Sequence, residues 1–144
     1  MKNVTELLNS KPHRAMVAVR PEDTVLDAIK ILAREDIGAA VVVSGDRLVG
    51  IFSERDYTRK VVLKGRQSET TKVEEIMTAN VVCVSPRAKT RDCMALMSEK
   101  NIRHLPVVEE GRVVGMVSIR DIVTDIIADQ DFTISQLEHY ISGQ

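Results

Sequence analysis

In the first part of the chain, the spacing of hydrophobic residues changes from every second residue, as in a strand, to every third or fourth residue, as in a helix. Val17 to Val19 alternates like a short strand. Pro21 to Thr24 then provides a turn and a helix cap, and from Val25 to about Arg34 apolar residues recur at the spacing of one helix face. The pattern predicts a strand followed by an amphipathic helix.

A hairpin and a second helix are expected next. The apolar runs Ala39–Val43 and Leu48–Phe52 flank the polar segment Ser44–Arg47, which is typical of two antiparallel strands joined by a turn. A helix is then predicted from Ser53 to about Leu63, where Lys64 and Gly65 end it.

The same pattern recurs 65 residues later. Val17–Thr58 aligns with Val82–Val123 without a gap, and 13 of these 42 positions are identical. The second copy predicts a strand, a helix, two hairpin strands and a helix at residues 82–84, 89–100, 105–108, 113–117 and 118–128. Two copies are too few for a solenoid, so we expect a closed pair related by a pseudo-twofold axis. We call these segments repeat one and repeat two.

The segments outside the repeats complete the expected division of the chain. A short apolar-faced turn precedes each repeat, and a further amphipathic helix is predicted to open at Thr133, with Ile134, Leu137 and Ile141 on one side. We therefore expect a first motif with its N-terminal helical turn, a polar linker, a second motif and a C-terminal amphipathic helix, at residues 1–64, 65–72, 73–130 and 131–144.

Composition limits the kinds of partner. The net charge is −1 and aromatic residues make up 3% of the chain, so a dominant nucleic-acid surface is not expected. A basic cluster does follow repeat one, and a solvated helix face is the favoured interpretation; its members are Arg55, Arg59, Lys60, Lys64 and Arg66.

The two cysteines and the absence of long apolar runs bear on location. Cys83 and Cys93 fall at apolar positions without the spacing of a metal pair, so both are expected to be buried, reduced thiols. No apolar run approaches the roughly 18 residues of a membrane span, and residues 1–5 lack a secretory h-region. We expect a cytoplasmic protein with no membrane partner.

Candidate chemistry lies where each hairpin turns into its second helix, in Gly50–Asp56 and in its twin Gly115–Asp121. A carboxylate in the first turn of a helix can accept hydrogen bonds from both hydroxyls of a ribose. The free N–H groups of the helix start, together with a serine hydroxyl and an arginine, suit a phosphate. An ordinary capping box uses the same serine and aspartate, so capping and nucleotide binding both remain open.

The ordered set of motifs resembles the CBS-domain pair, or Bateman module. Both repeats begin V-x-V-x-P and end G-x-x-S-x-R-D, and repeat two carries Arg103-His-Leu-Pro-Val-Val108 before its hairpin turn. The resemblance implies an α/β fold of two tandem CBS motifs, each β-α-β-β-α, in a stand-alone protein of the small bacterial type. It also implies a homodimer that binds AMP, ADP, ATP or NAD in the clefts between the motifs, with AMP favoured.

The resemblance places candidate ligand-binding residues at both clefts. For repeat two they are Thr78, Asn80, Val81, Arg103, His104, Leu105, Pro106, Ser118, Arg120 and Asp121. For repeat one they are Lys11, His13, Ala15, Met16, Ala39, Ala40, Val41, Ser53, Arg55 and Asp56. Repeat two is expected to be the better mononucleotide site, because repeat one has Gly38 and Ala39 where repeat two has Arg103 and His104.

The function expected from these observations is a non-catalytic sensor that signals through dimer shape or an unidentified protein partner. No nucleophile can be paired with His104, which is more typical of a polar cleft residue than of a catalyst, and no metal is required. The alternative is an interaction protein with vestigial clefts that works through the C-terminal helix.

Overall fold

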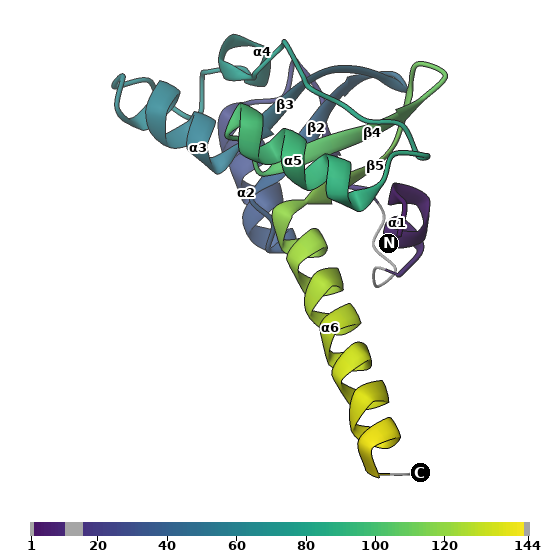
Figure 1. The fold of residues 1–144 in the computed structure, drawn as a ribbon. Helices are drawn as coiled ribbons and strands as arrows, with labels where there is room; N and C mark the ends of the chain where they lie inside the picture. The colour runs from purple at the N-terminus through teal and green to yellow at the C-terminus, as the bar shows by residue number, and fades with distance from the viewer. Residues whose placement is uncertain (1, 11–15, 143–144) are drawn as a thin grey trace.

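A computed structural model describes residues 2–10 and 16–142 of the protein. The fold is mixed α/β, as expected, with helices around one five-stranded sheet in the order β1-β2-β3-β5-β4 (Figure 1). Repeat one contributes the first three strands and repeat two the other two. The two hairpins are joined through the antiparallel pair Arg47 and Arg112.

Repeat one follows its sequence pattern closely. Its elements are β1 (Ala18–Val19), α2 (Val25–Glu35), β2 (Ala39–Ser44), β3 (Arg47–Ser53), α3 (Glu54–Asp56) and η1 (Tyr57–Val62). The Thr24 side chain caps α2 by accepting from the Asp27 N–H, and Asp36 ends α2 in the left-handed conformation at φ 53°. The predicted helix after Ser53 is therefore present, but most of it is π-helical.

Repeat two keeps the hairpin and both helices. Its elements are α5 (Thr90–Lys100), β4 (His104–Glu109), β5 (Arg112–Ser118) and α6 (Ile119–Ser142). The strand expected at residues 82–84 does not form. Val84 alone of these three bridges to β4, donating its N–H to the Pro106 carbonyl and accepting from the Val108 N–H. Two hydrogen bonds hold this residue to the sheet edge without building a ladder.

The short helices before each repeat exchange partners. Val4 and Leu7 of α1 (Val4–Ser10) are buried in the core of repeat two, whereas Val73 and Ile76 of α4 (Val73–Ile76) are buried in the core of repeat one. Helix α1 thus precedes repeat one in sequence but packs against repeat two. Its apolar face is covered by the other repeat, and burying that face decides where the helix packs.

The C-terminal region is one continuous helix. Thr133 was expected to open a new helix, but its hydroxyl donates to the Asp129 carbonyl one turn earlier, within α6. No glycine or proline interrupts residues 119–142, so nothing ends the helix near residue 131. The second half of α6 extends away from the sheet, and every residue from Ile127 to Ile141 is exposed (Figure 1).

The two cysteines have different environments. Cys93 is fully buried in the repeat-two core, and burial raises the pKa of its thiol. Cys83 is exposed, so the expectation of two buried thiols is wrong for Cys83. It lies in the segment that forms no strand, where no second layer covers it. No helix in residues 2–10 and 16–142 is both long and apolar enough to cross a membrane.

Candidate functional site

Each repeat ends its second hairpin strand in a serine that caps the following helix. In repeat one the Ser53 backbone is extended and its Oγ accepts from the Asp56 N–H at 3.1 Å, while the Ser53 N–H donates to Asp56 Oδ2 at 3.0 Å. In repeat two the Ser118 N–H donates to Asp121 Oδ2 at 2.8 Å, and the Asp121 N–H donates to Ser118 Oγ at 3.1 Å. We call these pairs the repeat-one clamp and the repeat-two clamp.

The repeat-one clamp has two further partners. Asp56 is 7% exposed, and its Oδ1 lies 3.0 Å from Lys60 Nζ and accepts from Thr78 Oγ1 at 3.4 Å. Lys60 belongs to η1 and also donates to the Ile76 carbonyl at 3.0 Å. Lys60 was expected on a solvated face. Its side chain is instead half-buried, and its ammonium group contacts one oxygen of the Asp56 carboxylate.

Thr78 reaches this clamp because the chain before repeat two passes along β3. Thr78 and Ile51 exchange two backbone hydrogen bonds, each 2.9 Å long. Gly50 permits this approach, because a Cβ there would lie 2.6 Å from Met77 Sδ and 3.0 Å from the Thr78 carbonyl oxygen. The sequence grouped Thr78 with the repeat-two clamp, and that grouping is wrong. The residue lies beside Asp56.

Asn80 and Val81 continue the same segment. The Val81 N–H donates to the Ala79 carbonyl, Asn80 is exposed, and the chain next contacts the sheet at β4 through Val84. Residues 78–84 therefore cross from the edge of repeat one to the edge of repeat two. The described contacts bring neither Asn80 nor Val81 to Asp121, so their roles as ligand contacts stay predictions.

The repeat-two clamp has a different neighbour at the position of Lys60. The residue four beyond Asp121 is Asp125, which is 8% exposed and paired with Lys2 Nζ at 2.7 Å. This ion pair raises the pKa of the Lys2 ammonium, chiefly through the hydrogen bond to Asp125. At this position α6 thus carries a second carboxylate, that of Asp125, and its cationic partner is Lys2 from the N-terminal segment.

The chain before repeat one is described only in part. Lys11, His13 and Ala15 lie outside the described residues, and Met16 is exposed. A Cβ on Gly115 would lie 2.9 Å from Leu8 Cδ1, so α1 passes over β5 closely, as the Met77 region passes over β3.

The first residues of β2 and β4 lie next to the clamps, as the sequence predicted. Sheet register places Ala39 opposite Ser53 and His104 opposite Ser118. The Arg103 carbonyl accepts from the Ile119 N–H at 2.9 Å, which ties the start of β4 to the start of α6. The remaining predicted residues of these strands are buried in the sheet; they are Ala40, Val41, Leu105 and Pro106.

These observations accompany a clear family match. A sequence model of the CBS domain matches residues 4–63 and 73–128, which includes both clamps and both exchanged short helices. The chain belongs to the CBS-domain family. The match has two copies, in agreement with the 65-residue repeat.

Solved structures and relatives of this CBS protein support the same fold. A protein with CBS domains from Burkholderia ambifaria MC40-6 is 50% identical, with a TM-score of 0.85 over 90% of this chain and 96% of that one. The CBS domain-containing protein CBSX3, mitochondrial, of Arabidopsis thaliana is 41% identical over 127 residues, which are 85% of this chain and 62% of the plant protein. The chain therefore spans less than two thirds of that relative.

A third similar protein was solved as a complex with a nucleotide. The CBS domain protein PAE2072 from Pyrobaculum aerophilum, complexed with AMP, is 27% identical, with a TM-score of 0.74 over 83% of this chain and 89% of that one.

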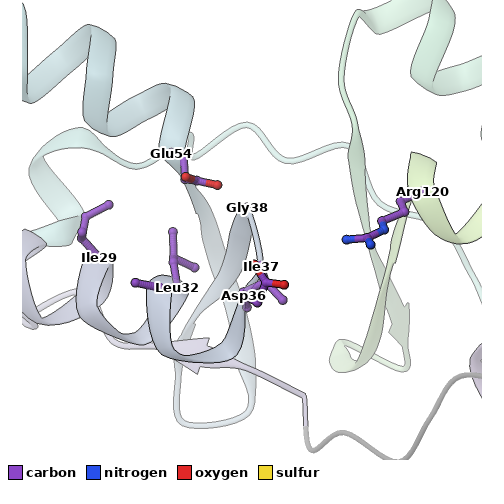
Figure 2. Close-up of a pocket in the computed structure, with 8 residues that line it drawn as sticks. Ile29, Leu32, Asp36, Ile37, Gly38, Glu54 and Arg120 are labelled. Carbon is purple, nitrogen blue, oxygen red and sulfur yellow. The ribbon is translucent and has the colours of Figure 1, made fainter.

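A shallow cavity of about 320 Å³ lies between the repeats of this CBS pair. Repeat one forms most of it with the end of α2, Gly38 and Glu54, and the Arg120 side chain extends toward it from the start of α6 (Figure 2). The sequence placed Arg120 with its neighbour Asp121, but Arg120 borders repeat one. Arg55, its twin, is exposed, and no described contact brings it to Asp56.

The sequence analysis missed three side chains near these sites. Asp36 and Glu54 line the cavity, and Lys60 contacts the repeat-one carboxylate. Lys60 was detectable in principle, because residues i and i+4 of a helix are neighbours and Asp56 with Lys60 is such a pair. The cavity residues gave no such signal, since they meet only through the packing of two repeats.

Proposed function

We propose that this CBS pair reversibly binds an adenine nucleotide, AMP in the first place, as a non-catalytic sensor. The observation that carries the proposal is the repeated clamp: a serine and an aspartate fixed at a helix start beside a strand end, once in each repeat. The AMP complex of the Pyrobaculum relative supports the choice of ligand.

The clamp residues have chemistry suited to a ribose monophosphate. A carboxylate can accept hydrogen bonds from both ribose hydroxyls, and the first turn of the 24-residue helix α6 offers N–H groups to a phosphate. Backbone groups at the starts of β2 and β4 supply the edge against which adenine would rest. Arg103 and His104 bring positive charge and hydrogen-bonding capacity to the start of β4, and the His104 ring lies beside repeat one, since a Cβ on Gly38 would lie 3.7 Å from His104 Cε1.

Titration calorimetry on dialysed protein tests this proposal. We expect micromolar binding of AMP, and measurement of ATP and NAD in parallel determines the preferred ligand. Millimolar or absent binding of all three would overturn the proposal. Unchanged nucleotide after long incubation with Mg²⁺ is the expected outcome for a sensor, and turnover would contradict the non-catalytic role.

A second candidate function, an interaction protein, is favoured by the outer half of α6. This half exposes large apolar side chains and carries acidic ones; the apolar residues are Ile127, Phe132, Ile134, Leu137, Tyr140 and Ile141. We propose that a second copy of the chain covers this face, which makes the sensor a homodimer. The double substitution Ile134→Gln with Leu137→Gln is then expected to lower the mass measured by light scattering while leaving AMP affinity unchanged. A dimer of unchanged stability would contradict the role of this face.

A further inference from the structure

Both carboxylate oxygens of the repeat-one clamp are already in contact with donors among the described residues. A carboxylate has about four lone-pair sites for hydrogen bonds. Asp56 Oδ2 accepts from the Ser53 N–H and the Ser53 hydroxyl, both at 3.0 Å, and Oδ1 contacts Lys60 Nζ at 3.0 Å and the Thr78 hydroxyl at 3.4 Å. A ribose diol needs two of these sites, so at least one present donor must leave before ribose binds.

Lys60 is the donor that can leave at the smallest structural cost. The Ser53 bonds belong to the helix cap, and Thr78 is held by two backbone hydrogen bonds to Ile51. Lys60 Nζ also donates to the Ile76 carbonyl at 3.0 Å, but the side chain is 44% exposed and its four-carbon stem is flexible, so the ammonium group can exchange both contacts for water without moving the backbone.

Repeat two does not have this lysine. Asp125 occupies the matching position, and its carboxylate pairs with Lys2. A cation supplied by the same helix to the ribose-binding carboxylate is therefore a property of repeat one, although both repeats share the serine, arginine and aspartate of the clamp.

We infer that Lys60 is a specificity-determining residue that holds the repeat-one site closed. Its ammonium group competes with the ribose diol for Asp56 Oδ1, and a nucleotide enters only when Lys60 is displaced. The inference rests on the proposed function, because it concerns access to the same clamp. It goes further by naming a group of this chain that controls access to the repeat-one site.

The test isolates the repeat-one site. In an Asp121→Ala background, which removes the repeat-two carboxylate, AMP affinity is measured by calorimetry with and without Lys60→Met. We expect Lys60→Met to tighten AMP binding about three- to tenfold, the effect of removing one partly exposed charge-assisted contact. Lys60→Arg keeps a cation and is expected to leave binding weak.

A matched control is available on the same segment. Lys64 is exposed, lies one turn further on and makes no ion pair among the described residues, so Lys64→Met is expected to leave AMP affinity unchanged. Melting curves verify that each variant folds. If Asp121→Ala does not fold, Asp121→Asn, which keeps an oxygen acceptor for the cap, takes its place.

The outcomes separate the two claims. AMP affinity that responds to Asp56→Ala but not to Lys60→Met overturns the inference and leaves the proposed function standing. Absence of AMP binding from the wild type and every variant overturns the proposed function, and the inference with it. Without nucleotide, reductive methylation is expected to modify Lys60 more slowly than Lys64, and equal rates in the wild type would also contradict the closed site.

Discussion

The two repeats build the same helix cap from the same residue types and then surround it with opposite charges. In repeat one, Asp56 contacts Lys60 and the hydroxyl of Thr78. In repeat two, the residue matching Lys60 is Asp125, and its counter-ion is Lys2 from the N-terminal segment. A duplicated motif therefore specifies the position of a carboxylate, while the residue four positions later places a cation beside it in repeat one and a second carboxylate on the same helix in repeat two.

The comparison also shows how the repeats depend on one another. Each short helix that precedes one repeat is buried in the core of the other, and the segment carrying Thr78 follows the same exchange. The repeat-one clamp is therefore completed by a residue that precedes repeat two in sequence. We expect such an exchange to couple the two clamps, because the segment after α4 contacts β3 through Thr78 and β4 through Val84.

The largest expected effect concerns Asp121→Ala. Loss of two charge-assisted hydrogen bonds to ribose is expected to cost about 1.5 to 3 kcal/mol of AMP binding, roughly 10- to 150-fold. Calorimetry measures the affinity and a melting curve measures the fold. An unchanged dissociation constant with a lowered melting temperature would mean that Asp121 acts only as a cap.

A smaller difference is expected between the two glycines that precede the clamps. Gly50→Ala places a Cβ against a backbone carbonyl oxygen as well as Met77, whereas Gly115→Ala meets only the side chain of Leu8 among its nearest neighbours. We expect Gly50→Ala to lower the free energy of unfolding by about 1 to 3 kcal/mol, and Gly115→Ala by less, because a side chain yields more easily than backbone. Equal urea midpoints would contradict the proposed difference between the two approaches.

The smallest effect comes from moving the repeat-one lysine into repeat two. Asp125→Lys places an ammonium group four residues after Asp121, and we expect it to weaken AMP binding at this clamp about three- to tenfold. Asp125→Asn, which removes the charge without adding a cation, is the control. If the lysine and asparagine variants bind AMP equally well, a cation at this position does not control access.

The sequence predicted the parts of the fold that depend on neighbouring residues. Helix α2 and both hairpins follow from local periodicity and turn residues, and the 65-residue repeat correctly indicated two tandem copies of one motif, which the resemblance identified as CBS motifs. The packing of α1 on repeat two and of α4 on repeat one was not predictable in this way. The apolar spacing of a short helix shows that it has a buried face, but not which core covers that face. The continuous α6 was missed because threonine is a common N-cap residue, whereas Thr133 lies in the interior of the helix, where its hydroxyl bonds to the Asp129 carbonyl.

The candidate site residues show the same difference between local contacts, which the sequence predicts, and long-range contacts, which it does not. Ser53 with Asp56 and Ser118 with Asp121 are local pairs, and the structure brings each pair together as expected. Thr78 and Arg120 were grouped with their sequence neighbours, but chain crossing places them against the opposite repeat. Lys60 could have been recognised from its spacing to Asp56, and considering charge at i+4 would have shown that the two clamps differ.

The order in which the two clamps fill tests the account most directly. Crystals grown with one molar equivalent of AMP per chain should show nucleotide density at Ser118 and Asp121, while Lys60 still contacts Asp56 in the other repeat. Density at Ser53 and Asp56 alone would contradict the claim that Lys60 closes the repeat-one site.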